Sequence, residues 1–461
     1  MITLLRAANF KSWKNTGDIQ LAPLTGLFGA NSSGKTSILQ ILLMLKQTVE
    51  SPDRRRVLHT GDDYTIVDLG TFLDLIHNHN KDTSLELAFS WTLPEPLVIN
   101  DPEAENKELF EVRKLAFSAH MNEMANRTVV DRFTYKFDSH SFGMRRRAEG
   151  TVAQSDKYDL EHGDYPARRV QGRPWPLPPP VKCYGFPDEA TRYYQNTGFL
   201  PDFVLAFEKM FSSIAYLGPL RDDPKRSYLW SGEQPPDVGG RGDEAVAALL
   251  AARAAGLKSG RMVKKKRRYK PIEERVLEWM QEMGLVYSFS LEPVAPNRKD
   301  YEFRVKRSKN GTEVQITDVG FGVSQILPVL VLCYYAPPYS TILLEQPEIH
   351  LHPFVQASLA DVLIDVVKER NVQVIVESHS EHLLRRLQRR IAENEVSDRG
   401  IAQNLTALYF CKNDGGESRI EKLDVDEFGS IRNWPSGFFG DEMAELTAIA
   451  EAAMSRQGAK V

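Results

Sequence analysis

The sequence predicts an α/β protein with a mixed β-sheet flanked by helices, and three observations support this prediction. A Gly/Ser-rich loop, GANSSGKTS, joins an apolar stretch, LTGLF, to a run with helical spacing, SILQILLMLKQ. Two later apolar stretches, in STILLEQPE and VQVIVESHS, have the length of buried strands. The first ends in acidic residues, and the second ends at Ser378, His379 and Ser380. A glycine-rich turn, DVGFGVSQ, begins another helix-like apolar run. Buried strands that alternate with helices are typical of a sheet with helices on its faces.

The composition excludes several classes of protein. The chain has 461 residues, and its 58 basic and 62 acidic residues leave a net charge of −4. This balance excludes a uniformly basic nucleic-acid coat, although it allows a local basic patch. The three cysteines lie far apart, which argues against a disulfide framework or a cysteine-rich zinc site. The longest apolar stretch, 326–336, is too short to span a bilayer, and the first residues lack a signal pattern, so we expect a cytoplasmic protein that enters no membrane.

The loop over residues 29–36 matches the pattern GxxxxGK[ST] and lies between a predicted strand and a predicted helix. Its glycines would let backbone N–H groups turn toward phosphate oxygens, and the helix start adds positive potential. We expect Lys35 to reach the β- and γ-phosphates of a nucleotide and the Thr36 hydroxyl to ligate Mg²⁺. The predicted nucleotide-binding residues of this loop are Gly29, Asn31, Ser32, Ser33, Gly34, Lys35, Thr36 and Ser37. The alternative is a chance Gly/Ser turn.

A second glycine-rich turn predicts another anion site, because Ser324 begins a helix-like run after Gly320 and Gly322. This turn cannot easily reach the same phosphates in its own chain, since the first loop already fills that position. We therefore expect a homodimer, or a higher even-numbered oligomer, in which the chains meet head to tail. In that arrangement, Ser324 of one chain caps the nucleotide that the other chain binds.

Polar residues follow the two later strands, and each suits a role in phosphate chemistry. Glu345 ends the first strand, where a carboxylate can hold Mg²⁺, often through water. Gln346 and Glu348 come next, and a second polar group there can position an attacking water. His379 follows the other strand and can hydrogen-bond the γ-phosphate. The predicted metal ligands are Thr36 and Glu345, and the predicted catalytic residues are Glu345, Gln346, Glu348 and His379.

Four segments can be distinguished along the chain. Residues 1–85 hold the first strands, the phosphate loop and its helix, and the alternating pattern of residues 86–205 predicts an inserted β-rich arm with helical parts. Residues 206–412 return to strands and helices, and residues 413–461 form a C-terminal tail without a motif of its own. The stretch 253–270 holds nine basic residues and no acid. It is either a contact for the phosphate backbone of a nucleic acid or a solvated basic loop.

Four motifs together resemble the ABC-type ATPases of the SMC-like class. They are NFKSWKNTGDIQLAPLTGLFGANSSGKTSILQILLMLKQ, VGFGVSQILPVL, LLEQPEIHLHP and ESHSEHLL, and their order and spacing agree with that class. The resemblance covers roughly residues 1–85 and 206–412, and it is closest to the overcoming-lysogenisation-defect-like ATPases. It implies a P-loop NTPase fold with an ABC/SMC-type ATPase head, and it implies ATP and Mg²⁺ as cofactors. Lys35 and Thr36 then match the phosphate-loop pair, and Ser324 with its two glycines matches the signature loop.

The acidic motif of this resemblance departs from the usual pattern at two positions. Glu345 takes the place of the acid associated with Mg²⁺, which is usually Asp, and His379 takes that of the switch histidine. Residues 350–353 take the place of a loop that faces the dimer partner. The position after the acid usually holds a catalytic Glu, whereas Gln346 can orient a water but cannot accept its proton. Hydrolysis is then slow, or Glu348 serves instead, or the residue was substituted to trap ATP, and we favour the first two explanations.

The resemblance favours an ATPase that closes a dimer on ATP and controls a separate effector, commonly a nuclease, in bacterial anti-phage defence. An ATP-gated scaffold that hydrolyses little and sequesters an effector is one alternative, and a DNA repair or recombination ATPase is another. The lack of sustained heptads argues against a repair clamp with long coiled coils. The expected partners are a second copy of the chain, a nuclease-like effector and, through residues 253–270, nucleic acid.

Overall fold

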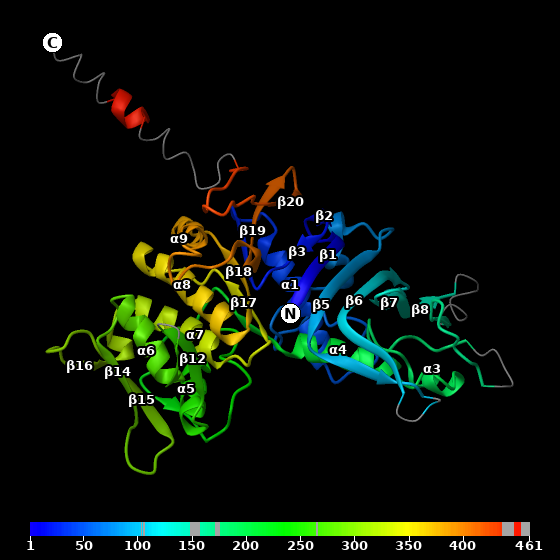
Figure 1. Ribbon diagram of the computed structural model, residues 1–461, viewed down its shortest axis with the longest axis horizontal. Helices are drawn as coiled ribbons and strands as arrows, with labels where there is room; N and C mark the ends of the chain where they lie inside the picture. Colours follow the sequence, from blue (N-terminus) through cyan, green and yellow to red (C-terminus); the bar gives the residue numbers. More distant parts are fainter. Residues whose placement is uncertain are drawn as a thin grey trace.

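The structure is a computed structural model of the chain. It describes residues 1–102, 104, 107–147, 157–170, 176–263, 266–435 and 447–452, and for residues 261–263, 266 and 267 it describes the backbone alone. Helices α5 to α9 gather on one side of a central group of strands, and strands β5 to β8 form a separate lobe on the other side (Figure 1).

A six-stranded sheet lies at the centre of the fold. Its order is β10 (Ile214–Leu217), β17 (Thr341–Glu345), β18 (Gln373–Ser378), β4 (Leu24–Gly29), β19 (Thr406–Asp414) and β20 (Glu417–Lys422). The first five strands are parallel, and β20 is antiparallel to β19. Strands β4, β17 and β18 are buried along their whole length, which explains their continuous apolar sequences. The predicted α/β class with a mixed sheet is confirmed.

The two faces of this sheet pack into two different cores. On β18, Ile375 belongs to a core that includes α1 (Lys35–Glu50), whereas Val374 and Val376 belong to a core built with later helices. Those later helices are α5 (Ala245–Ala254), α6 (Ile272–Glu282), α7 (Phe321–Tyr335), α8 (Pro353–Arg370) and α9 (Glu381–Ala392). Helix α7 is apolar on nearly every side because α5, α6 and α8 pack around it.

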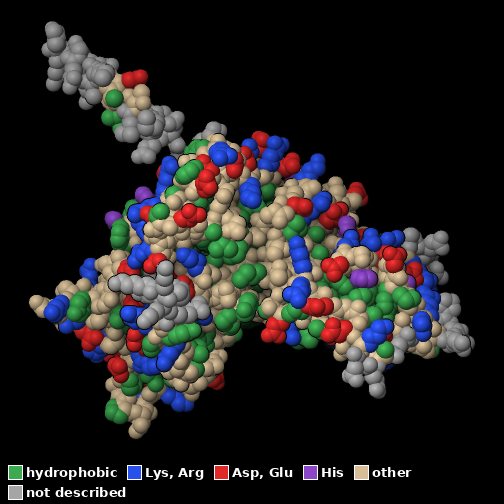
Figure 2. All heavy atoms as spheres, viewed as in Figure 1, with side chains coloured by type: hydrophobic (Ala, Val, Ile, Leu, Met, Phe, Trp, Pro, Cys, Tyr) green, Lys and Arg blue, Asp and Glu red, His purple; other side chains and the backbone are tan. Residues whose placement is uncertain are grey.

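An eight-stranded antiparallel sheet forms the second lobe and joins the first residues of the chain to the predicted arm. It contains β1 (Ile2–Phe10), β2 (Trp13–Asn15), β3 (Ile19–Gln20), β5 (Leu85–Asn100), β6 (Glu108–Met124), β7 (Arg127–Phe137), β8 (His140–Arg146) and β9 (Tyr158–Glu161). Because β5 pairs with β1, the arm of residues 86–205 extends the N-terminal sheet. Helix α4 (Leu200–Ser212) covers this sheet, and Phe207 stacks on Tyr184 and meets the Phe117 ring at a tilt. Figure 2 shows apolar side chains gathered in the middle of this face, where the two lobes meet.

Smaller elements complete the described part of the chain. A third sheet contains β11 (Tyr228–Leu229), β14 (Ser288–Pro293), β15 (Asp300–Lys306) and β16 (Glu313–Gln315). Short helical segments are α2 (Phe72–Leu75), α3 (Asp188–Tyr193) and the 3-10 turns His77–His79, Ile316–Asp318 and Gln403–Leu405. Of the helices in the described ranges, none has the length and apolar character needed to cross a bilayer.

The basic stretch 253–270 forms a hairpin of β12 (Lys258–Val263) and β13 (Lys266–Pro271) after α5. Lys264 and Lys265 lie outside the described residues. At the two ends of the stretch the basic side chains are paired, because Arg253 contacts Glu273 at 2.7 Å and Lys270 contacts Glu278. Part of its positive charge is therefore neutralised within the chain.

Candidate nucleotide-binding site

The phosphate loop is held by elements from three parts of the chain. Gly29 has a φ of 141°, and a Cβ there would lie 2.1 Å from the carbonyl oxygen of Cys411 on β19. Gly34 has a φ of 89°, and a Cβ there would lie 2.5 Å from Ser418 Oγ on β20. The Gly34 carbonyl also accepts a hydrogen bond from Trp13 Nε1 at 3.0 Å. The two glycines are thus required both by their backbone conformation and by the close approach of neighbouring strands.

The loop opens into a small cavity at the C-terminal ends of the central strands. Its volume is about 190 Å³, and it lies at the start of α1, where open α/β sheets bind ligands. The residues that line it are Ser12, Asn31, Ser32, Ser33, Gly34, Lys35, Thr36, Ser37, Gln346, Glu377 and His379. Seven of the eight predicted loop residues therefore line one cavity, together with the predicted Gln346 and His379.

Lys35 lies folded over the loop. Its ammonium group donates hydrogen bonds to the carbonyls of Gly29 at 3.1 Å and Ala30 at 2.7 Å, and to Ser33 Oγ at 3.3 Å. Burial lowers its pKa, and the nearby Glu377 carboxylate opposes that shift. Since the ammonium bonds only to neutral groups of its own loop, anionic oxygens in the cavity would be stronger acceptors.

Glu377 is a cavity residue that the sequence reasoning missed. Thr36 Oγ1 donates a hydrogen bond to its carboxylate, with distances of 2.8 Å and 3.0 Å to the two oxygens. Burial raises the pKa of Glu377 to about 7, and the adjacent Glu345 acts in the same direction. One signal was available: Glu377 lies on β18, one residue before the strand's end, and the predicted site residue His379 follows two positions later.

Glu345 and Gln346, at the end of β17, lie differently with respect to the cavity. Glu345 Oε2 accepts a hydrogen bond of 2.7 Å from the hydroxyl of Tyr216, and Glu345 is not among the residues that line the cavity. Burial raises its pKa. Gln346 does line the cavity, and its backbone N–H donates to the Glu377 carbonyl at 2.9 Å. Gln346 has a φ of 44°, a strained conformation for a residue with a side chain and one that concentrates at functional sites.

Glu348 lies behind the cavity wall. Its Oε1 accepts hydrogen bonds from the His379 backbone N–H at 2.6 Å and from Ser378 Oγ at 2.8 Å. Burial raises its pKa and lowers that of the neighbouring Arg221 to about 10. His379 itself lines the cavity, and burial together with Lys35 lowers its pKa. In this arrangement Glu348 holds the peptide that carries His379.

The signature-loop residues do not reach the cavity of their own chain. Ser324 is buried in the first turn of α7, where its Oγ donates to the Phe321 carbonyl at 2.9 Å, and neither predicted glycine of this turn lines the cavity. The Phe321 ring is 52% exposed and meets the His350 ring edge-on at 5.6 Å. Phe354, which follows the same loop, is 53% exposed. The predicted signature loop and the predicted dimer-facing loop therefore share one outward surface.

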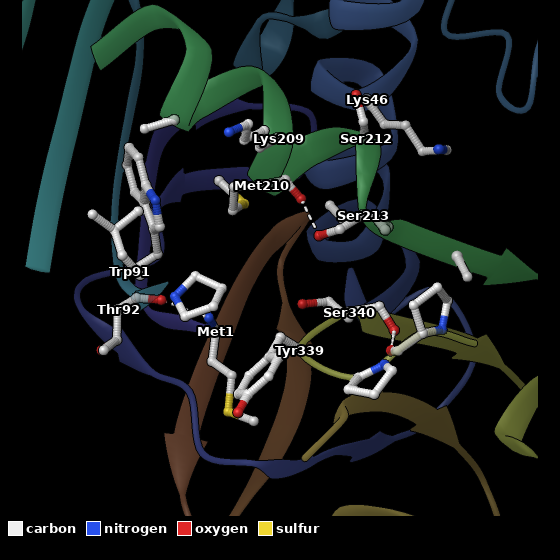
Figure 3. A pocket seen from close by; sticks show the side chains of 18 of the residues that line it. Met1, Lys46, Trp91, Thr92, Lys209, Met210, Ser212, Ser213, Tyr339 and Ser340 are labelled. Carbon is white, nitrogen blue, oxygen red and sulfur yellow. Dashed lines mark hydrogen bonds between the residues drawn. The ribbon is translucent and has the colours of Figure 1, made fainter. Parts of the chain in front are cut away.

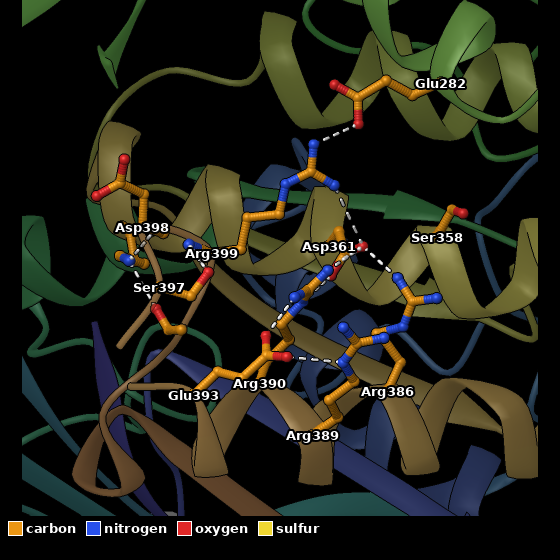
Figure 4. Close-up of polar contacts among 12 residues, drawn as sticks. Glu282, Ser358, Asp361, Arg386, Arg389, Arg390, Glu393, Ser397, Asp398 and Arg399 are labelled. Atoms are coloured by element: carbon orange, nitrogen blue, oxygen red, sulfur yellow. Dashed lines mark hydrogen bonds and ion pairs between the residues drawn. The ribbon is translucent and has the colours of Figure 1, made fainter. Parts of the chain in front are cut away.

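Helices α8 and α9, which flank the His379 segment, are joined by a buried ionic cluster (Figure 4). Asp361 on α8 contacts Arg386 at 2.5 Å and Arg390 at 2.6 Å, both on α9, and lies 3.8 Å from Arg399. At the start of α9, Ser380 Oγ accepts a hydrogen bond from the Leu383 backbone N–H at 3.0 Å. The cluster thus fixes the helix that begins directly after the histidine.

A larger cavity of about 800 Å³ lies at the opposite edge of the central sheet, near the first residues of β10 and β17 (Figure 3). Met1, Trp91, Met210 and Tyr339 are among its lining residues. It brings together none of the predicted site residues. Among the residues that the structure describes, no group of three or more histidine, cysteine, aspartate or glutamate side chains is arranged to hold a metal ion by itself.

Comparisons with known proteins agree with this geometry. Residues 1–149 match the family "AAA ATPase domain", residues 265–385 match "AAA domain, putative AbiEii toxin, Type IV TA system", and residues 401–449 match "Protein of unknown function (DUF3696)". A search of curated proteins gives no match. The first two matches include the phosphate loop and the ends of β17 and β18, so both halves of the candidate site lie in segments that are similar to ATPase domains.

Among solved structures, the chain is similar to an SMC head bound to the C-terminal winged-helix domain of ScpA. The identity is 13%, the match covers 92% of this chain and 98% of that chain, and the TM-score is 0.46. It is also similar to the SMC head domain from Thermotoga maritima, with 10% identity, coverage of 92% and 99%, and a TM-score of 0.39. The predicted fold class, a P-loop NTPase with an ATPase head, is confirmed by the strand order, the loop and the ATPase-domain match.

Proposed function

We propose that the chain binds Mg²⁺ and ATP at the phosphate-loop cavity and hydrolyses ATP slowly. The observation that carries this proposal is the convergence on one cavity of Lys35, Thr36, Gln346, Glu377 and His379, which come from three separate segments. The lysine would neutralise phosphate charge, and the loop amides and the start of α1 would bind the phosphate oxygens.

The residues present fit a magnesium ion. The Thr36 hydroxyl uses its one hydrogen toward Glu377, which leaves its oxygen lone pairs free for a cation. Mg²⁺ prefers oxygen ligands and is usually held by one or two protein groups together with substrate phosphates and water. When bound, the ion would screen the negative charge that develops on the phosphates.

The side-chain amide of Gln346 in the cavity supports slow ATP hydrolysis. Gln346 is held at a strained φ with its side chain in the cavity, and it can orient a water without accepting its proton. Glu348, the other candidate for that step, is engaged by Ser378 and by the His379 backbone. The same observations favour the second candidate function, an ATP-gated scaffold that closes on ATP and scarcely turns it over.

Head-to-tail dimerisation is supported by the outward surface around Phe321. Phe321 and Phe354 are both about half exposed and lie at the signature loop and directly after the predicted dimer-facing loop, and clustered exposed apolar groups commonly mark contact sites. Ser324 lies beneath this surface and away from the cavity of its own chain, so a second copy would bring it to the nucleotide.

The resemblance of the four motifs supports control of a separate, nuclease-like effector in bacterial anti-phage defence, with the dimer opening and closing as the signal. Nucleic acid binding through residues 253–270 is the least supported part of the proposal, because Arg253 and Lys270 already form ion pairs within the chain. A cytoplasmic location and a role in DNA repair stay predictions from the sequence.

Nucleotide binding is tested by Lys35→Ala, with the exposed Lys81→Ala as the matched control. We expect a fluorescent ATP analogue to bind wild-type protein and Lys81→Ala equally, and to bind Lys35→Ala at least about tenfold more weakly, since a charged contact is lost. Wild-type protein that binds no nucleotide would refute the proposal. Binding without measurable turnover would select the scaffold over the ATPase.

A further inference from the structure

The end of β18 carries a carboxylate closer to the phosphate loop than the acid that the sequence selects. In the central sheet, β18 lies between β4 and β17, and Glu377 pairs with Leu27 on one side and with Glu345 on the other. Glu377 therefore lies between the phosphate-loop strand and Glu345. It lines the cavity, which Glu345 does not.

The hydrogen bonds of the two acids separate their roles. The Glu377 carboxylate accepts from Thr36 Oγ1 at 2.8 Å and 3.0 Å. The Glu345 carboxylate accepts from Tyr216, which belongs to β10 at the edge of the sheet. Thr36 is the loop residue whose hydroxyl suits Mg²⁺. Since this hydroxyl donates to Glu377, the acid that orients it lies on β18 and not on β17.

A simpler interpretation makes Glu377 a counter-ion for Lys35. Their closest atoms are 3.9 Å apart, beyond hydrogen-bonding distance, and the ammonium bonds to loop carbonyls instead. The contact with Thr36 is more than 1 Å shorter than this ion pair. Glu377 is therefore aligned on the hydroxyl more closely than on the ammonium.

At the C-terminal ends of β17 and β18, the buried acidic groups outnumber the basic groups near them, so a bound cation would improve the charge balance. Glu345, Glu348 and Glu377 are all buried, and the basic groups that act on them are Lys35 and Arg221. Lys35 is the one of the two that lines the cavity, and it would be drawn to phosphate when a nucleotide binds. A divalent cation beside Thr36 would restore the balance that a buried carboxylate pair needs.

We propose that Glu377, rather than Glu345, is the positioning carboxylate on the magnesium side of the nucleotide site. It orients the Thr36 hydroxyl so that its oxygen faces the cation, and its backbone carbonyl fixes the strained Gln346 beside the same cavity. This inference rests on the proposed function, because it assigns the metal side of the same site.

The test compares Glu377→Gln with Glu345→Gln, which change two glutamates in paired positions of neighbouring strands. Glu377→Asp is the conservative variant. Affinity for Mn²⁺ in the presence of a non-hydrolysable ATP analogue is followed by electron paramagnetic resonance, and analogue affinity without metal is measured in parallel. We expect Glu377→Gln to weaken Mn²⁺ binding by about 10- to 100-fold, as outer-ligand changes do, and Glu345→Gln to weaken it less. Glu377→Asp is expected to recover part of the loss.

Metal-free analogue affinity should change little in all three variants, because Lys35 and the loop are intact. Coinciding thermal melts of wild type and Glu377→Asp would show that the aspartate variant folds. If Glu345→Gln weakens Mn²⁺ binding as much as Glu377→Gln does, or more, the assignment of Glu377 is wrong. The proposed function would still stand in that case, provided that wild-type protein binds the nucleotide analogue. Failure of wild-type protein to bind the analogue at all would instead refute the proposed function.

Discussion

The phosphate loop and the signature loop both place glycines at the start of a helix, yet the fold holds them very differently. Strands β19 and β20 and Trp13 press against the phosphate loop so closely that a Cβ on Gly34 would collide with Ser418. Around Gly320 a Cβ would meet nothing within 4 Å, and the neighbouring Phe321 is half exposed. The phosphate loop is thus enclosed by its own chain, whereas the predicted signature loop faces outward, as the proposed composite site between two chains requires.

The largest expected effect concerns the support of the first site. Asp361→Asn should lower the free energy of unfolding by about 3 kcal/mol, because Arg386 loses its buried partner and Arg390 keeps only Glu393. Urea unfolding measures this loss. Glu381→Gln is the control on α9, the helix of the two arginines, since the pair of Glu381 with Arg385 is half exposed and worth at most about 0.5 kcal/mol. Equal effects of the two changes would contradict a supporting role for the cluster.

The next effect compares the two glycines directly. Gly34→Ala should destabilise the chain by about 1–3 kcal/mol, because alanine at a φ of 89° is strained and its Cβ has no space. Gly320→Ala, at a φ of −59° with open space, should change stability by less than about 0.5 kcal/mol. Thermal or urea denaturation of both variants provides the comparison, and a costly Gly320→Ala would show that the signature loop is confined within its own chain.

A smaller effect is expected at the outward surface. Phe321→Ala should leave the stability of the monomer nearly unchanged but weaken ATP-dependent self-association by about tenfold, since buried aromatic anchors contribute most to interfaces. Sedimentation velocity with and without ATP measures both species. Phe428→Ala removes a more exposed ring far along the chain and is the control. Self-association that depends equally on both rings would place the interface elsewhere.

The last prediction concerns the three cysteine thiols, which should not react with a thiol reagent in the folded chain. Burial raises the pKa of Cys183, Cys333 and Cys411 to about 12, so the thiolate fraction at pH 8 is about 10⁻⁴. A thiol reagent should label none of them in the folded chain between pH 7 and pH 9, whereas denaturant should expose all three. Rapid labelling of Cys411 alone would show that the strand beneath the phosphate loop opens independently.

The local parts of this site could be predicted from the sequence, and the relation between its strands could not. The phosphate loop is contiguous, and its flanking apolar runs are unambiguous, so Lys35 and Thr36 were placed by pattern. The position of β18 beside β4 depends on pairing between residues more than 300 positions apart, and that pairing brings Glu377 to Thr36. From the sequence, Glu345 is the expected metal-side acid, because it ends a strand and takes the place of the acid in the resemblance.

The arm and Glu348 illustrate the same limit. Alternation of apolar and polar residues predicted strands between residues 86 and 205, but nothing in that segment indicates that β5 pairs with β1. Glu348 follows a strand end in a loop, where no periodicity specifies direction, and the structure turns its carboxylate toward Ser378 and the His379 backbone. Whether Ser324 reaches a nucleotide depends on a second chain.

The composite site is tested most directly by mixing two variants. Lys35→Ala disables the phosphate loop, and Gly322→Asp places a negative charge in the signature loop, where an added Cβ would come no closer than 4.0 Å to Leu285 and Leu351. Each variant alone should show no ATP turnover, and a one-to-one mixture should recover about a quarter of the wild-type rate, because half of the dimers then hold one intact site of two. Full turnover by Gly322→Asp alone, or no recovery in a mixture of folded variants, would contradict a site shared between two chains.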